Sequence, residues 1–143
     1  MICHRQRLDN AVDYLYGRTM RVVSIDTSVT FETPNAIMRT YASPVQGGSA
    51  LAVWRTVMAP GSAGPSHALS SEQTIVVLEG RLRLESADEA WTLATGDSIT
   101  IPAAADRRVR NAGDTVLVTL SAALPGATAQ VGEAEPVPVP WTT

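Results

Sequence analysis

The chain is divided by turn signals into many short runs of β-branched and apolar residues. From Met20 to Leu124 these runs alternate with clusters rich in glycine, proline, asparagine or aspartate. No long helix pattern and no repeat of fixed period interrupts the series. Closely spaced short strands separated by turns are typical of a sandwich or a barrel. The sequence therefore predicts an all-β domain over residues 20–124.

Three segments give the clearest strand signals. Residues 51–58 are rich in β-branched residues, and Arg81 to Glu85 alternates so that Leu82 and Leu84 share the inward face. Thr74 to Leu78 is apolar on both faces, which predicts cover from the barrel interior on one side and from a second layer or subunit on the other. Further strands are expected at 21–25, 29–32, 36–41, 90–93, 98–101, 107–111 and 115–121.

The two ends of the chain differ from its middle. Residues 1–19 are either a short N-terminal helix, begun by Asp9 and ended by Gly17, or an extension upstream of a natural start at Met20. Both interpretations stay open, and the neighbours Cys3 and His4 are too few to indicate a metal site. Residues 125–143 carry alternating prolines, which favours an extended, solvated tail up to position 139 with Trp141 at least partly buried.

Composition restricts the partners. The 143 residues suit one domain, and 45% hydrophobic with 17% charged residues is typical of a globular protein. A net charge of -3 without a basic run argues against nucleic acid. The single cysteine excludes an internal disulfide, and no apolar run has the length of a membrane span. We expect a cytoplasmic protein without a nucleic-acid or membrane partner.

The basic residues limit the chemistry. All eleven are arginine, so Schiff-base chemistry on a lysine is excluded. Only two histidines, His4 and His67, are available for imidazole chemistry.

The stretch from Gly61 to Gly80 combines a glycine and proline turn, His67, a polar patch and an apolar strand. With the later Gly96, Pro102 and Asn111, its spacing resembles the two sequence motifs of cupins over roughly residues 48–121. The resemblance implies a small double-stranded β-helix, or jelly-roll barrel, with a site in its interior.

The same motifs imply a metal site of three histidines and a glutamate, from which this chain departs. Only His67 stands at a ligand position, whereas Leu69, Gln73 and Arg107 occupy the other three. A shift of one residue would bring Glu72 inward in place of Gln73, but the spacing to Gly80 favours Gln73. In the second motif Ala104 replaces a glycine. One imidazole does not hold a divalent ion, so we expect no metal cofactor, and His67 as the ligand if one binds.

These positions instead predict a pocket for a small organic molecule, anionic or polyketide-like. His67 is a candidate proton carrier, and Arg107 a candidate oxyanion partner unless Glu72, Glu32 or Asp106 neutralises it. The candidate ligand-binding residues are Gln73, Leu69, Trp54 and Met58, although the last two are equally explained as core. Both histidine and glutamine have a purely structural interpretation, in which they hydrogen-bond only within the protein.

Three functions follow as alternatives. The first is a metal-independent isomerase, cyclase or lyase, and the second is a non-catalytic ligand-binding or sensing domain. The third is a metal-dependent dioxygenase that recruits ligands from outside the motifs. The two-faced strand 74–78 and the early strands also predict a homodimer, because one small barrel does not cover them.

Overall fold

The computed structural model describes residues 20–143, so the expected N-terminal helix, Cys3 and His4 lie outside the described residues. The regular secondary structure of the described part is almost entirely strand, and a single 3₁₀ turn, η1 (Pro140–Thr142), follows the strands within this range. The strands are β1 (Thr30–Glu32), β2 (Ile37–Ala42), β3 (Ala52–Met58), β4 (Ala68–Leu69), β5 (Gln73–Glu79), β6 (Leu82–Ser86), β7 (Glu89–Leu93), β8 (Ser98–Ile101), β9 (Arg108–Asn111), β10 (Leu117–Ala123), β11 (Thr128–Gln130) and β12 (Val137–Pro138).

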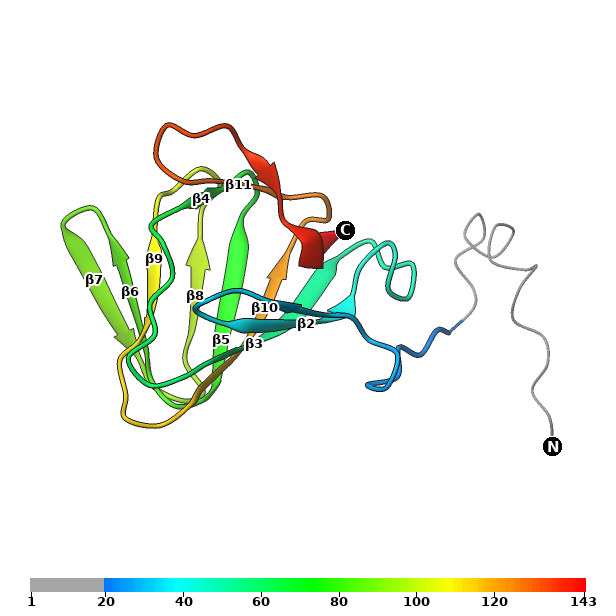
Figure 1. The fold of residues 1–143 in the computed structure, drawn as a ribbon, viewed down its shortest axis with the longest axis horizontal. Coiled ribbons are helices and arrows are strands. Elements are labelled where there is room, and N and C mark those ends of the chain that lie inside the picture. Colours follow the sequence, from blue (N-terminus) through cyan, green and yellow to red (C-terminus); the bar gives the residue numbers. More distant parts are fainter. Residues whose placement is uncertain (1–19) are drawn as a thin grey trace.

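The strands form an antiparallel jelly roll (Figure 1). One layer is a six-stranded sheet in the order β1-β2-β3-β10-β5-β8. Two three-stranded sheets, β7-β6-β9 and β12-β11-β4, complete the barrel. The segment before β4 joins these two, because Ala63 pairs with Arg110 and His67 with Arg107. The predicted all-β jelly-roll class is confirmed.

The barrel core follows the period-two alternation of the strands. Leu82 and Leu84 of β6 are 0% and 2% exposed, as the alternation in the sequence predicts. In β5 the residues Ile75 and Val77 are buried on the inner face, whereas Leu78 on the outer face is 46% exposed. Among residues 20–143, therefore, the barrel interior covers one face of β5, and no second layer covers the outer face.

Gly80 makes the turn from β5 into β6. Its φ is +84°, in the left-handed region that favours glycine. A Cβ at this position would also lie only 2.5 Å from the Val116 carbonyl oxygen. The turn signal Glu79-Gly80 thus has two physical causes, backbone conformation and lack of space.

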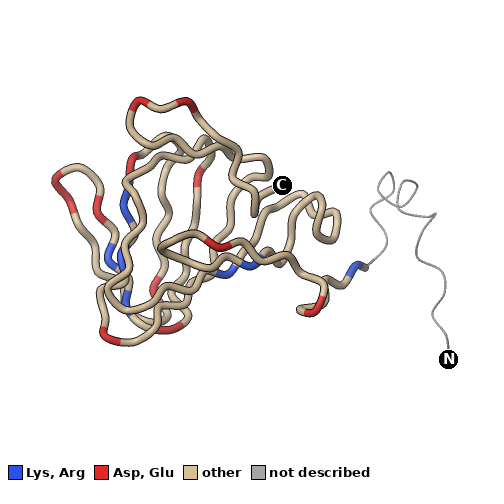
Figure 2. The backbone as a smooth tube through the Cα atoms, in the orientation of Figure 1, with Lys and Arg blue, Asp and Glu red and all other residues tan. Residues whose placement is uncertain are grey.

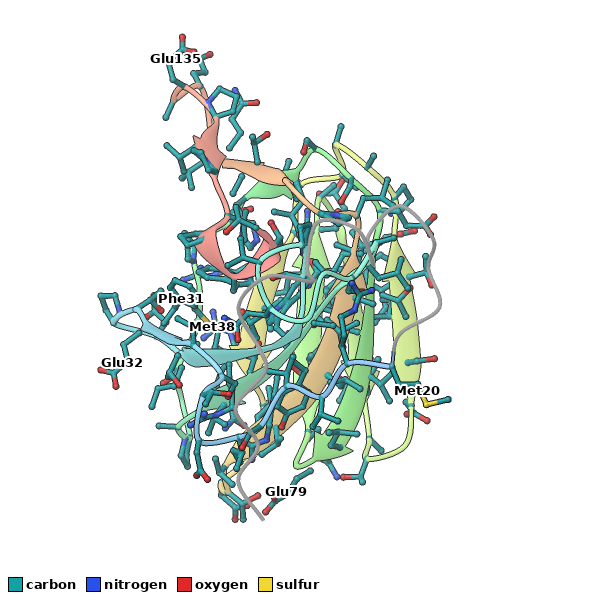
Figure 3. The ribbon with its side chains drawn as sticks, turned by 90° about the vertical axis from the view of Figure 1, so that its right-hand side faces the viewer. Met20, Phe31, Glu32, Met38, Glu79 and Glu135 are labelled. Carbon is teal, nitrogen blue, oxygen red and sulfur yellow. The ribbon has the colours of Figure 1, made fainter. Side chains whose placement is uncertain are left out.

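The C-terminal segment packs against the barrel. β11 pairs with β4, and the Val139 side chain is only 3% exposed. η1 lies against the β1–β2 hairpin, where the Phe31 and Trp141 rings have centroids 6.2 Å apart and Thr40 donates a hydrogen bond to the Trp141 carbonyl over 3.1 Å. In Figure 3, Phe31 and Met38 lie together beside this turn, whereas Glu135 marks the outer tip of the β11–β12 loop. The expected partial burial of Trp141 is confirmed, but position 139 is not solvated.

The segment before β1 is not a strand. Residues 21–25 were expected to be one from their apolar residues, but they form irregular backbone that leads into a turn, and Val22 is 93% exposed. No strand of the described structure pairs with the backbone of this segment, although the Arg39 side chain of β2 donates a hydrogen bond to the Ile25 carbonyl over 3.0 Å. Its strand propensity therefore has no partner strand to satisfy it. Among residues 20–143 there is also no helix long and apolar enough to cross a membrane.

Arginine positions gather on two parts of the barrel, on β6 and β9 and on β2 and β3 (Figure 2). On β6 and β9, Glu85 pairs with Arg83 at 2.9 Å and with Arg110 at 3.6 Å. These side chains are partly exposed, so the pairs contribute little to stability.

Candidate functional site

A cavity of about 360 Å³ occupies the barrel interior. Inward-facing residues of β3, β5 and β10 form its floor, and the loop at 33–36 and the C-terminal residues Val139 and Trp141 contribute to its wall. Its volume is in the range of small-molecule sites, about 300–1,000 Å³.

The four ligand-binding residues expected from the sequence all line this cavity. Trp54 and Met58 are each 4% exposed and also line the cavity, so each residue packs in the core and forms part of the cavity wall. Leu69 supplies further apolar wall from β4, and Gln73 supplies a polar group from the start of β5. Most of the remaining lining is aliphatic, so the cavity suits a ligand with an apolar body.

Three hydroxyl groups that β3 and β10 contribute to the lining were not expected. Thr56 of β3 lies opposite Thr119 of β10 in the sheet register, and Ser121 follows two residues further along β10. The sequence pattern of β10 predicts the opposite orientation, because Val118, Leu120 and Ala122, which alternate with Thr119 and Ser121, are more apolar and would be expected to face inward. The sheet nevertheless turns the hydroxyls inward.

Gln73, not Glu72, faces the interior. The Gln73 side chain is 8% exposed and lines the cavity, whereas Glu72 is exposed on the other face of the chain. Because neighbouring strand residues point to opposite faces, only one of the two is able to do so. The spacing to Gly80 therefore predicted the right residue.

Arg107 is fully buried, at 0% exposure, but it is not among the residues that line the cavity. Its Nη2 donates to Gln73 Oε1 over 2.6 Å and its Nη1 donates to the Ala105 carbonyl over 3.1 Å. These two bonds direct the guanidinium behind Gln73. Arg107 therefore reaches the cavity only through the Gln73 amide, whereas its direct contact with a ligand stays a prediction.

The charge of Arg107 lacks a neutralising ion pair within residues 20–143. Both ion pairs found in this range involve Glu85, and Arg107 Nε is buried without a hydrogen-bond partner there. Of the three expected carboxylates, Asp106 is the one whose charge acts on Arg107, and it accepts a hydrogen bond from Ser66 instead. Burial lowers the pKa of Arg107 to about 10, with Asp106 acting in the opposite direction, so the group stays charged at neutral pH.

His67 lies at the cavity wall, on the loop that enters β4. Its backbone exchanges hydrogen bonds with that of Arg107 over 2.9 and 2.8 Å, which fixes the loop against β9. Its Nδ1 lies 2.9 Å from the Pro65 carbonyl oxygen. A carbonyl only accepts, so Nδ1 carries the proton and Nε2 keeps its lone pair. Burial, with a smaller effect of the Arg107 charge, lowers the pKa of His67 below 6.5, so the ring is neutral at pH 7.

The four motif positions do not form a site for a divalent cation. His67 offers one nitrogen lone pair, Leu69 offers none, and Gln73 Oε1 is occupied by the guanidinium of Arg107. No group of three or more histidine, cysteine or acidic side chains that could hold a metal is found in the described part of the chain. A cation would also face the uncompensated charge of Arg107.

Two further motif residues confirm the expected register. Asn111 Nδ2 donates to the Met58 carbonyl over 3.0 Å and to the Thr115 carbonyl over 2.8 Å, so it closes the turn before β10. Ala104, which stands at the motif glycine, has a φ of +64°. The backbone at this position adopts the left-handed conformation that favours glycine, although the residue is alanine.

Comparison with known proteins gives the same family. The model of the cupin domain family matches residues 54–122. A stretch of 65 residues is 38% identical to a 1-hydroxy-2-naphthoate 1,2-dioxygenase from Nocardioides sp. (strain KP7), and it covers 43% of this chain and 17% of the dioxygenase. The chain therefore spans a small part of that enzyme.

Solved structures show the same barrel. The polyketide cyclase RemF from Streptomyces resistomycificus superposes with a TM-score of 0.63 at 20% identity, over 74% of this chain and 80% of the cyclase. An RmlC-like cupin from Shewanella frigidimarina superposes with a TM-score of 0.62 at 16% identity, over 75% of this chain and 92% of that one. At these identities the likeness concerns the fold alone. With its jelly roll, its motif register and the matching family model, the chain belongs to the cupin superfamily.

Proposed function

We propose that the protein binds a small organic molecule with a flat apolar body and an oxygen-bearing end inside its barrel, without a metal ion. The observation that carries this proposal is the cavity itself, which is walled by Trp54, Met58 and Leu69 and has polar groups from Gln73 and Ser121. Aromatic hydroxy acids and polyketide-like ring systems have this character. The names of the similar dioxygenase and cyclase agree with that ligand class.

We further propose that His67 moves a proton on this ligand, as in an isomerase, cyclase or lyase. The free lone pair on Nε2 and the lowered pKa make the ring a base at neutral pH. A base of this kind removes a proton next to a carbonyl, and the positive charge behind Gln73 favours the oxyanion that develops.

A non-catalytic binding or sensing domain is the second candidate. One observation favours it: His67 is the single titratable side chain among the described residues that line the cavity. An enzyme with one such group must use it as both acid and base. A metal-dependent dioxygenase is disfavoured, because the donor set at the motif positions does not fit a metal.

A thermal-shift titration with 1-hydroxy-2-naphthoate tests the ligand class. We expect a rise in the melting temperature with ligand concentration, and no such rise with acetate, which is too small to fill the cavity. The Leu69→Trp variant, whose larger side chain fills part of the cavity, should lose the response. Equal responses of the unchanged protein and this variant would place the ligand outside the barrel and contradict the proposal.

Two measurements separate the candidates. In an enzyme the change His67→Gln abolishes turnover, whereas in a binding domain it leaves the affinity within a few-fold. Elemental analysis of the purified protein tests the absence of a metal, and stoichiometric iron, zinc, manganese or nickel would overturn it.

A further inference from the structure

Three buried polar side chains form a chain of hydrogen bonds that ends at the cavity. Arg107 donates to Gln73 Oε1 over 2.6 Å, and Gln73 Nε2 donates to Ser121 Oγ over 3.4 Å. The exposed fractions of the three residues are 0%, 8% and 3%, and Gln73 and Ser121 line the cavity. They come from the approach to β9, from β5 and from β10, so the barrel closure itself brings them together.

The direction of this chain is fixed at its start. Arginine has only donors, so the Gln73 atom that faces Arg107 must be the oxygen. The amide nitrogen then points to Ser121, and the Ser121 oxygen accepts from it. Since bulk water is largely excluded here, each group must keep the role that its neighbour imposes.

The consequence appears at the cavity surface. Ser121 uses one lone pair for Gln73, and no acceptor for its own hydroxyl proton is found among residues 20–143. The second N–H of Gln73 is likewise a donor. The polar end of the cavity therefore offers protons, and a ligand that also has only a donor there would leave the Ser121 hydroxyl unpaired.

We propose that the Arg107–Gln73–Ser121 chain selects ligands that place a hydrogen-bond acceptor, a carbonyl or anionic oxygen, against Ser121 and Gln73. Ser121 is then a specificity-determining residue, and Arg107 is a positioning residue that acts through Gln73. This inference rests on the proposed binding of organic molecules in the barrel and adds the chemistry of their polar end.

Two probes with one carbon framework test it. 1-Tetralone carries a carbonyl that only accepts, and tetralin lacks the oxygen. Their dissociation constants are measured by fluorescence titration, because the Trp54 and Trp141 rings line the cavity. The quantity of interest is the preference, the ratio of the tetralin constant to the tetralone constant, since it cancels effects of a variant on the apolar wall.

We expect Ser121→Ala to lower this preference by about tenfold, as the loss of one buried hydrogen bond predicts. Gln73→Glu should lower it as well, because the substituted carboxylate still accepts from Arg107 but accepts from Ser121 instead of donating to it. If Ser121→Ala does not fold, Gln73→Glu alone tests whether the preference depends on this chain of hydrogen bonds. The control Thr56→Val removes a cavity hydroxyl outside the chain, and it should keep the preference within about twofold.

The outcomes are distinct. Binding of both probes with a preference that neither Ser121→Ala nor Gln73→Glu changes would overturn the inference and leave the binding pocket intact. A loss of preference in Thr56→Val equal to that in Ser121→Ala would also overturn it, because any hydroxyl would then suffice. Binding of neither probe to the unchanged protein would overturn the proposed function, and this inference with it.

Discussion

The buried charge of Arg107 makes a quantitative prediction about stability. The guanidinium is fully buried, makes two hydrogen bonds and leaves Nε unpaired among the described residues. Burial lowers its pKa from the ordinary arginine value to about 10, which corresponds to about 3–4 kcal/mol against the charged form at ~1.36 kcal/mol per pKa unit. Among residues 20–143, Gln73 is the one side chain that accepts a hydrogen bond from Arg107.

The change Gln73→Leu keeps the side-chain volume and removes that acceptor. A hydrogen bond to a charged group contributes about 1.5–3 kcal/mol, and the unpaired charge adds a desolvation cost. We therefore expect the free energy of unfolding to fall by about 3 kcal/mol. Arg107→Met removes the charge but leaves Gln73 Oε1 unpaired, so these effects largely offset each other and the loss should stay within about 1 kcal/mol.

The double variant identifies the cause. With Leu at position 73 and Met at position 107, neither a charge nor an orphaned amide remains, and we expect a stability within about 1 kcal/mol of the unchanged protein. The coupling between the two positions is then about 2–3 kcal/mol, far above the ~0.5 kcal/mol within which independent sites add.

Urea unfolding followed by tryptophan fluorescence measures all four proteins at one protein concentration. At an m-value of about 2 kcal/mol/M, Gln73→Leu should lower the unfolding midpoint by about 1.5 M. Additive effects of the two changes, or a loss below about 1 kcal/mol for Gln73→Leu, would refute the account of Arg107 as a buried charge that depends on Gln73.

Three further predictions concern other parts of the protein. Ala104→Gly should raise the free energy of unfolding by about 0.5–1 kcal/mol in the same assay, because it relieves a positive φ, whereas Gly80→Ala should lower it through the clash with the Val116 carbonyl; the opposite signs would contradict this. Since the folded protein holds His67 at a lowered pKa, the unfolded chain binds the extra proton. The contribution of His67 to the free energy of unfolding is therefore complete above pH 6.5 and is lost as the pH falls below it. His67→Gln should flatten the dependence of the free energy of unfolding on pH between pH 7.5 and 5.5. Equal slopes for the variant and the unchanged protein would contradict the lowered pKa of His67. Finally, the exposed outer face around Leu78 predicts a homodimer that Leu78→Arg dissociates, and sedimentation of the unchanged protein as a monomer at micromolar concentration would count against it.

The fold and half of the site could be predicted because they depend on local periodicity and spacing. Alternation in β6 places Leu82 and Leu84 inward, and the distance to Gly80 places Gln73 inward. Both follow from the geometry of one strand and its turn. The inward position of Ser121 does not, because the sheet register of three strands decides which face of β10 meets the cavity.

Other features depend on contacts that no local pattern contains. The proline-rich composition after Leu124 is typical of a solvated tail, yet Thr40 and Phe31 provide the contacts that hold Trp141 and with it the end of the chain. The direction of the Arg107 side chain depends on which acceptors lie within reach, the Gln73 amide and the Ala105 carbonyl. Sequence spacing located the residue, but only the packed barrel shows that it lies behind the cavity wall.

The arrangement of donors and acceptors gives the departures from the cupin motifs a common explanation. A metal site needs lone pairs that converge on one point, whereas Arg107 supplies only protons and turns the Gln73 oxygen away from the cavity. The positive charge that a metal would bring is then present as a guanidinium, and the Gln73 amide separates it from the cavity. His67, on the loop before β4, keeps the opposite character, because its free Nε2 accepts a proton. These groups match the proposed proton transfer, in which the acceptor on this loop removes the proton and the donors on β5 and β10 stabilise the oxyanion that develops.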